Sequence, residues 1–129
     1  MARDALFPDG LVRPNAPYSP VVRSGDHVYT AGQVGFDATG TLVAGGVAAQ
    51  TRQTLANLEA CLGAAGCTLD DVVKVNVFLV DLADFDAFNE VYRAAFAEPY
   101  PARTTVQVGL PGGIRVEIEA VARLSSASS

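Results

Sequence analysis

The hydrophobic pattern changes its period in the middle of the chain, and this change constrains the fold more than any other feature. Along residues 47–64 the side chains expected to face inward recur three or four positions apart: Val47, Thr51, Leu55, Leu58 and Leu62. That spacing is typical of one face of an amphipathic helix, and Gly66 follows where a glycine commonly ends one. Residues 72–80 then form a near-continuous apolar run, VVKVNVFLV, which predicts a strand covered on at least one face.

The remaining elements complete an alternating order of strands and helices. Residues 18–35 contain two short β-like runs that break at Ser24, Gly25 and Asp26, a signal for a hairpin. A second helix is predicted over residues 83–97, with Phe85, Phe88, Tyr92 and Phe96 on its apolar stripe. Residues 101–122 supply two last strands around a turn at 110–113. The order ββ-α-β-α-ββ predicts an α+β fold, with one mixed sheet and two helices on a single face.

The 129 residues are about the size of one domain. Prolines at 8 and 14 predict an irregular N-terminal arm over residues 1–14, and residues 125–129 are expected to be a flexible tail.

The second face of the sheet predicts self-association. Val116, Ile118, Ala120 and Ala122 share one face of the last strand, while Arg115, Glu117, Glu119 and Val121 share the other. Apolar residues also occupy both parities of residues 72–80. A sheet that helices cover on one side only, and that is partly apolar on the other, is expected to pack against copies of itself. We therefore expect a homo-oligomer with sites at the interfaces between subunits.

Composition excludes several classes of function. The chain has nine basic and fourteen acidic residues, a formal net charge of −5 and no basic run. Nucleic acid is therefore not an expected partner. Cys61 and Cys67 have no common metal-binding spacing, and His27 is the single histidine. No apolar run approaches the roughly 18 residues of a membrane span, and no secretory signal begins the chain. We expect a cytoplasmic protein that binds neither a membrane nor a metal.

Charged side chains in the last two apolar strands are the candidates for chemistry. Arg103 presents a planar, permanently charged fork that suits a carboxylate, although an exposed arginine at a strand end would look the same. Glu117 falls in the middle of a strand, where a carboxylate needs solvent or a partner. If residues 103–109 and 114–121 pair as a hairpin, Arg103 is a diagonal neighbour of Glu117. Glu117 could then act as a general acid and base, with Glu119 as the competing candidate.

Other polar residues could have either a functional or a purely structural role. Tyr18 could donate a hydrogen bond at a pocket rim or be a packed aromatic with a solvated hydroxyl. Asn89 lies off the apolar stripe of its helix, which is usual for a surface residue. Lys74 could anchor an anion but is more often a charge at a strand edge.

Several stretches together carry a resemblance to a known family: NAPYSPVV, HVYTAGQVG, QTRQTLANLEACLGAAG, DVVKVNVFLVDLADFDAFNEVYRAAF and PARTTVQVGLP followed by VEIEAVA. They are similar to the RidA (YjgF) family of reactive-intermediate deaminases over residues 15–123, and the PAR and VEIEA elements are the most specific part. The resemblance implies a chorismate-mutase-like fold over residues 1–129, assembled as a homotrimer with a site in each cleft between subunits.

The resemblance also implies roles for individual residues. Arg103, in PAR, is expected to hold the carboxylate of the substrate, and Glu117, the first glutamate of VEIE, to activate a water. Tyr18, Gly32 and Asn89 are expected to line the pocket, with Thr105 as a further substrate-binding position. Many family members have serine where this chain has Ala31 and cysteine where it has Thr105, so substrate preference is expected to differ.

The implied reaction is hydrolytic deamination of 2-enamino and 2-imino acids to 2-keto acids and ammonia, without a cofactor or a metal. The alternatives are a non-catalytic trimer that binds small carboxylates and, less favoured because of the acidic charge, an endoribonuclease.

Overall fold

The computed structural model describes residues 3–125. The strands are β1 (Asp4–Leu6), β2 (Val21–Ser24), β3 (His27–Thr30), β4 (Val72–Leu79), β5 (Ala102–Gln107) and β6 (Val116–Arg123). The helices are α1 (Gly46–Ala64) and α2 (Phe85–Ala95), with short 3-10 turns η1 (Leu69–Asp71) and η2 (Leu82–Asp84). The predicted order of elements is confirmed from residue 18 onward, and Gly66 has the positive φ (83°) expected of a residue that ends α1.

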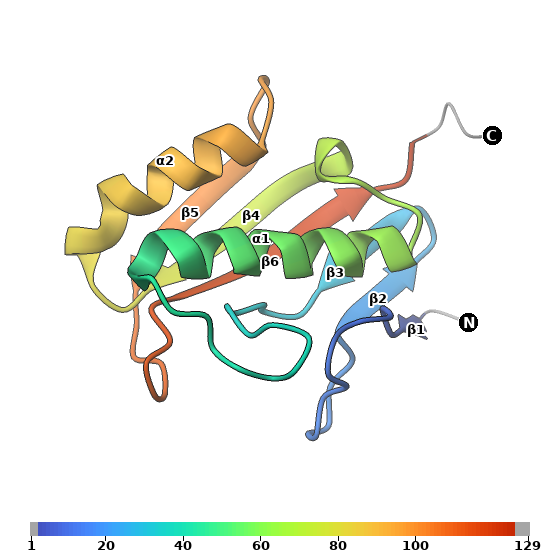
Figure 1. The fold of residues 1–129 in the computed structure, drawn as a ribbon. Helices are drawn as coiled ribbons and strands as arrows, with labels where there is room; N and C mark the ends of the chain where they lie inside the picture. Colours follow the sequence, from blue (N-terminus) through green and yellow to red (C-terminus); the bar gives the residue numbers. More distant parts are fainter. Residues whose placement is uncertain (1–2, 126–129) are drawn as a thin grey trace.

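The strands form one mixed sheet in the order β1-β2-β3-β6-β4-β5. Strands β4 and β5 run parallel and are connected through α2, whereas every other neighbouring pair within the described residues is antiparallel. Figure 1 shows α1 and α2 side by side on the same side of the sheet, with α2 over β5. The predicted α+β architecture, a mixed sheet with two helices on one face, is therefore confirmed.

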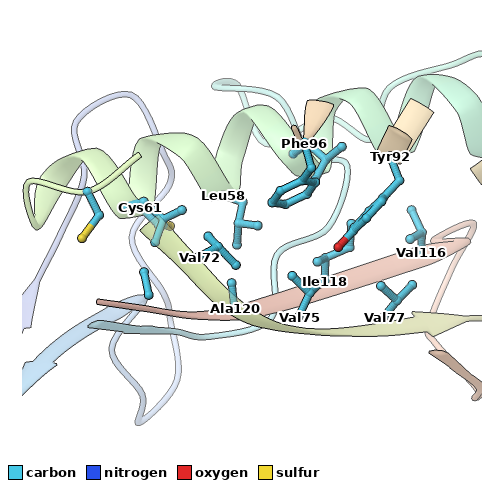
Figure 2. Close-up of a cluster of buried hydrophobic side chains, with 14 of the residues drawn as sticks. Leu58, Cys61, Val72, Val75, Val77, Tyr92, Phe96, Val116, Ile118 and Ala120 are labelled. Atoms are coloured by element: carbon cyan, nitrogen blue, oxygen red, sulfur yellow. The ribbon is translucent and has the colours of Figure 1, made fainter. Parts of the chain in front are cut away.

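The core lies between this sheet and the two helices. In Figure 2, side chains of β4 and β6 point toward α1 and α2. The buried side chains of β6 are Val116, Ile118, Ala120 and Ala122, as the alternating pattern predicted, and those of the central part of β4 are Val75, Val77 and Leu79. Opposite them Leu58 of α1 and Phe88 of α2 are fully buried. Truncating Leu58 to alanine is expected to cost about 2–5 kcal/mol of unfolding free energy.

The other face of the sheet is open, and we call it the open face. It carries the residues of β6 that alternate with the buried ones, including Glu117 and Glu119. Tyr29 lies opposite Val121 and is 45% exposed, and Val106 lies opposite Phe78 and is 42% exposed. Strand β4 is thus buried on one face and not on both.

The N-terminal segment differs from its prediction in one respect. Residues 4–6 form β1, which pairs antiparallel with residues 21–23 of β2, so the arm over residues 1–14 is not irregular throughout. Its prolines lie outside the strand, and Pro8 follows it closely. Of the predicted C-terminal tail, residues 126–129 lie outside the described part of the chain.

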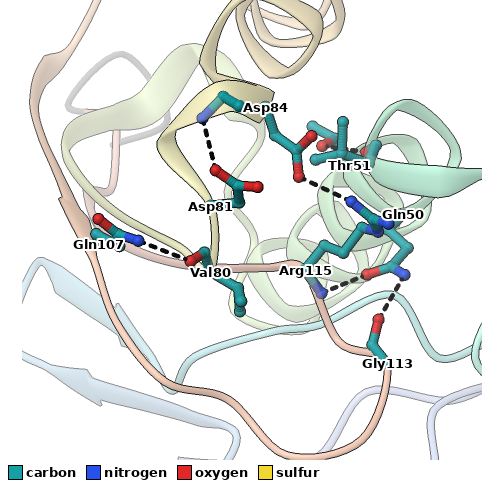
Figure 3. A network of polar contacts seen from close by, with 10 residues as sticks. Gln50, Thr51, Val80, Asp81, Asp84, Gln107, Gly113 and Arg115 are labelled. Atoms are coloured by element: carbon teal, nitrogen blue, oxygen red, sulfur yellow. Dashed lines mark hydrogen bonds and ion pairs between the residues drawn. The ribbon is translucent and has the colours of Figure 1, made fainter.

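Hydrogen bonds link the segment between β5 and β6 to α1 (Figure 3). The buried Gln50 donates from Nε2 to the Gly113 carbonyl over 3.0 Å and accepts at Oε1 from the Arg115 backbone N–H over 2.8 Å. The Arg115 guanidinium also pairs with Asp84 at 3.1 Å. These contacts fix the backbone immediately before Val116, where β6 begins.

Candidate functional site

Arg103 lies on β5 beneath α2. It is opposite the buried Val75 in the sheet, so its side chain points to the face that the helices cover. Nη1 donates a hydrogen bond to Asn89 Oδ1 over 2.8 Å, and Cζ lies 4.7 Å from the centre of the Tyr92 ring. The rings of Phe85 and Phe88 are 5.6 and 5.5 Å away. Such aromatic faces stabilise a guanidinium, and together with Asn89 they orient it.

The guanidinium of Arg103 lines a cavity of about 250 Å³. The other lining residues are Asn89, Tyr92, Arg93, Tyr100 and Pro101. Within residues 3–125 no carboxylate lies within ion-pair distance of Arg103. The burial and the aromatic surroundings therefore position a cation whose charge is not neutralised by another side chain of the same chain.

Glu117 lies on the open face of β6, opposite Phe78 of β4. A Cβ added to Gly32 would collide with Oε2 of Glu117, which shows that the Glu117 carboxylate lies directly against Gly32. Gly32 is held there by its neighbour, since Gln33 and Ile118 exchange two backbone hydrogen bonds of 2.8 and 3.0 Å. No hydrogen bond or ion pair links the Glu117 carboxylate to another described residue. Burial raises the pKa of Glu117, and the nearby Glu119 carboxylate raises it further.

The predicted hairpin between the strands of Arg103 and Glu117 is wrong. Strand β4 lies between β5 and β6, so the two side chains are not diagonal neighbours. Arg103 is opposite Val75 and Glu117 is opposite Phe78. Val75 and Phe78 are three positions apart on one strand and point to opposite faces. A single chain therefore presents Arg103 on the helix side of the sheet and Glu117 on the open side.

The other predicted site residues divide between these two places. Asn89 is bonded to Arg103, and Thr105 lies two positions after Arg103 on the same side of β5, with a buried hydroxyl that has no hydrogen-bond partner among the described residues. Tyr18 is 55% exposed and, with Gly32, lines a cavity of about 350 Å³ between the N-terminal segment and the loop after β3. The structure thus brings Arg103, Asn89 and Thr105 together beneath α2. It places Glu117 against Gly32, which also lines a cavity with Tyr18.

Two contacts near the site were not found from the sequence. Tyr92 was predicted only as a core residue, and its contact with Arg103 depends on β5 lying under α2. Asn76 was not singled out, although its Nδ2 donates to Glu119 Oε2 over 3.0 Å. Lys74, one of the alternative anion anchors, donates to Thr104 Oγ1 over 3.0 Å.

Within residues 3–125, no three His, Cys, Asp or Glu side chains are grouped as metal ligands. In the same part of the chain, neither helix has the length and apolar character needed to cross a membrane.

The family profile described as Endoribonuclease L-PSP matches residues 11–124, which is most of the chain. The chain belongs to this family, also known as RidA or YjgF. The predicted family is therefore confirmed. Among members, the human 2-iminobutanoate/2-iminopropanoate deaminase is 47% identical over 108 residues, covering 82% of this chain and 79% of the human protein. A RutC family protein of Pyrococcus horikoshii is 43% identical over 122 residues, covering 93% of this chain and 97% of that protein.

Solved structures of RidA/YjgF proteins have the same fold. RidA from an Antarctic Psychrobacter species has a TM-score of 0.89 and 45% identity, covering 95% of this chain and 100% of that one. Escherichia coli TdcF with bound serine has a TM-score of 0.88 and 38% identity, covering 95% of this chain and 99% of that one. The RidA/YjgF fold thus extends over nearly the whole chain described here.

Proposed function

We propose that this protein hydrolyses 2-imino acids, formed by tautomerisation of 2-enamino acids, to 2-keto acids and ammonia. The observation that carries the proposal is the pair of charged groups described above, neither of which forms an ion pair with another described residue. Arg103 offers a positioned cation without a carboxylate, and Glu117 offers a half-buried carboxylate without a hydrogen-bond donor. A 2-imino acid needs both, since it has an anion to bind and a carbon to which water must add. Deaminases of such imines are named among the relatives at 47–48% identity.

Arg103 is the proposed anchor of the substrate carboxylate. A guanidinium binds a carboxylate through two parallel hydrogen bonds, which fixes the orientation of the attached carbon as well as its position. Asn89 accepts from Nη1, so it limits rotation of the fork while the other N–H groups stay available. Thr105, two positions along the same strand, has an unpartnered hydroxyl that would serve as a further donor near the anchored group.

Glu117 is the proposed acid and base. The water oxygen bonds to the imine carbon while Glu117 accepts a proton from the water and passes it to the imine nitrogen, which gives a carbinolamine. Glu117 next carries the proton of the carbinolamine hydroxyl to the amine nitrogen. The C–N bond then breaks, the C=O bond forms and ammonia leaves. A raised pKa suits a carboxylate that must take up and return a proton in each turnover.

The site is proposed to form between two copies of the chain within a homotrimer. Because Arg103 and Glu117 point to opposite faces of one sheet, one chain cannot place both on a small substrate. Arg103 of one copy would meet Glu117, Gly32 and Tyr18 of another. The partly apolar open face, with Tyr29 and Val106 exposed, supports association because apolar area of this kind is commonly covered by a partner.

The reaction is tested by generating 2-iminopropanoate in situ with an amino-acid oxidase and measuring how much the protein accelerates pyruvate formation. We expect Arg103→Ala and Glu117→Gln each to lose most of the acceleration. Arg52→Ala and Glu59→Gln, on the exposed side of α1, are matched controls and should keep it. Absence of acceleration by the wild-type protein would contradict the proposal, and full activity of Arg103→Ala would remove the anchor role.

A second candidate, binding of small carboxylates without turnover, is favoured by one observation: the TdcF structure contains bound serine, which has a carboxylate but no imine. Saturable binding of 2-ketobutyrate, lost in Arg103→Ala, together with no effect on imine hydrolysis, would support this candidate instead.

A further inference from the structure

Two carboxylates share the open face of β6 and have different surroundings. Glu117 and Glu119 are two positions apart, so their Cα atoms are about 7 Å from one another and both side chains point away from the helices. Glu119 is opposite Asn76 in the sheet, and Glu117 is opposite Phe78. One carboxylate therefore has an amide across from it and the other has an aromatic ring.

The amide of Asn76 holds the Glu119 side chain in place. Nδ2 of Asn76 donates to Glu119 Oε2 over 3.0 Å, in a partly buried position. This hydrogen bond restricts the side chain, so that its negative charge stays over the sheet instead of turning into solvent.

Glu117 has the opposite environment. Its carboxylate rests on the backbone of Gly32 and has no hydrogen-bond donor among the described residues. Burial disfavours its charged form, and a fixed negative charge two positions away disfavours it further.

From this geometry we infer that Asn76 and Glu119 are positioning residues for the acid–base function of Glu117. The amide fixes the Glu119 carboxylate beside Glu117, and the charge of Glu119 makes Glu117 the member of the pair that takes up and releases the proton. The inference rests on the proposed imine hydrolysis for its catalytic meaning, but the arrangement of the two carboxylates is independent of the substrate.

The other charged groups on the open face lie in contacts of their own, away from Glu117. Lys74 donates to Thr104, while Arg123 and His27 both contact Asp26 at the far end of the sheet. Among the described residues, the remaining titratable side chain that faces this side is Tyr29 of β3. Arg115 also lies two positions from Glu117, but its guanidinium pairs with Asp84. Strand β5 presents no ionisable group on this face, where its described residues are Ala102, Thr104 and Val106. The segment that Glu117 contacts, Ala31, Gly32 and Gln33, has no ionisable side chain either. Glu119 is therefore the carboxylate on this face that lies two positions from Glu117.

The test is a pH titration of Glu117 by ¹³C NMR, on the full-length protein with labelled glutamate side chains, in the wild type, Glu119→Gln and Asn76→Ala. Glutamine keeps the shape of Glu119 and can still accept from Asn76, so Glu119→Gln removes the charge with little change in packing. We expect the Glu117 midpoint to move to lower pH in Glu119→Gln. A smaller move in the same direction is expected in Asn76→Ala, where Glu119 is free to turn away. Glu59→Gln removes the same charge from an exposed position on α1 and should leave the midpoint unchanged.

Activity gives a second measurement. The acid limb of the pH profile of kcat/KM should move to lower pH in Glu119→Gln, because a base with a lower pKa stays ionised further into the acid range. A Glu117 midpoint that is the same in Glu119→Gln and Glu59→Gln would overturn the inference. So would complete inactivity of Glu119→Gln with retained activity of Glu117→Gln, since the roles would then be reversed. If the wild type does not hydrolyse imines, the proposed function fails, while the NMR midpoints still decide this inference.

Discussion

The Glu117 carboxylate occupies the space that a Cβ on Gly32 would fill. Gly32→Ala is therefore expected to displace the carboxylate, because the free end of Glu117 moves more easily than the backbone that Gln33 and Ile118 hold in place. We expect kcat for imine hydrolysis to fall roughly 10–100-fold, the effect of misplacing a catalytic group by about 1 Å. The melting temperature should change little, which circular dichroism will measure.

Gly63→Ala is the matched control for this substitution. Gly63 lies in α1, and a Cβ there meets no atom within 4 Å. Alanine stabilises a helix interior by about 0.5–1 kcal/mol relative to glycine. Gly63 is the second-last residue of α1, so the gain should be smaller, and this variant should melt no lower than the wild type and keep its full rate. An unchanged rate in Gly32→Ala would show that the contact with Glu117 has no role in catalysis.

The contact between Asn89 and Arg103 predicts a sensitive position for substrate binding. Asn89→Asp would place a carboxylate 2.8 Å from the guanidinium, where it competes with the carboxylate of the substrate. We expect KM, and the Kd for 2-ketobutyrate measured by calorimetry, to rise roughly tenfold or more, which corresponds to about 1.4 kcal/mol. Asn89→Ala removes the hydrogen bond without adding a charge, so its effect should be smaller. Equal effects of the two variants would contradict competition by the new charge.

The proposed assembly of the site from two copies predicts complementation between inactive variants. In a co-expressed mixture of Arg103→Ala and Glu117→Gln chains, some interfaces combine the intact Glu117 of one variant with the intact Arg103 of the other. Random mixing in a ring of identical contacts gives such a pairing at about a quarter of the sites, so about a quarter of the wild-type rate should return. Each variant alone stays inactive. A mixture without activity, shown by mass spectrometry to contain mixed oligomers, would place both groups of a site on one chain.

The raised pKa of Glu117 predicts a dependence of stability on pH. A carboxyl group whose pKa is higher in the folded chain than its ordinary 4.5 binds its proton more tightly when folded. Its contribution to stability is therefore fully present below the pKa of the unfolded chain and is lost as the pH rises through the folded pKa. Glu117→Gln should then melt at a higher temperature than the wild type at pH 7, and at nearly the same temperature at pH 3. Scanning calorimetry at the two pH values will test this, and a lower melting temperature of the variant at pH 7 would contradict it.

Much of the fold was predictable because helix and strand periods are local properties of the sequence. The alternation Val116, Ile118, Ala120 identified the buried face of β6, and the Ser24–Asp26 break identified the hairpin of β2 and β3. Strand β1 was missed because a three-residue strand beside prolines has too few residues to show a period. Its pairing with β2 is a tertiary contact.

The neighbours of β5 were not predictable in the same way. A turn at Pro111 and Gly112 suggested a hairpin, but residues 108–115 instead carry the chain across the end of β4. This misplacement led to the expectation that Arg103 approaches Glu117 within one chain. The residues themselves were selected by their chemistry and by resemblance to a family. Their division between two faces of a sheet depends on strand order, which local patterns do not specify.

The two hydrogen bonds of Gln50 make the position of β6 independent of the length of the loop over residues 109–112. Because they hold Gly113 and Arg115, α1 fixes the backbone at the start of β6, while the ladders with β3 and β4 fix its register. Insertions or deletions between 109 and 112 would then be absorbed as a longer or shorter surface loop while Glu117 keeps its place over Gly32. A chain with this fold is then free to change its length at this loop without moving the carboxylate at the position of Glu117.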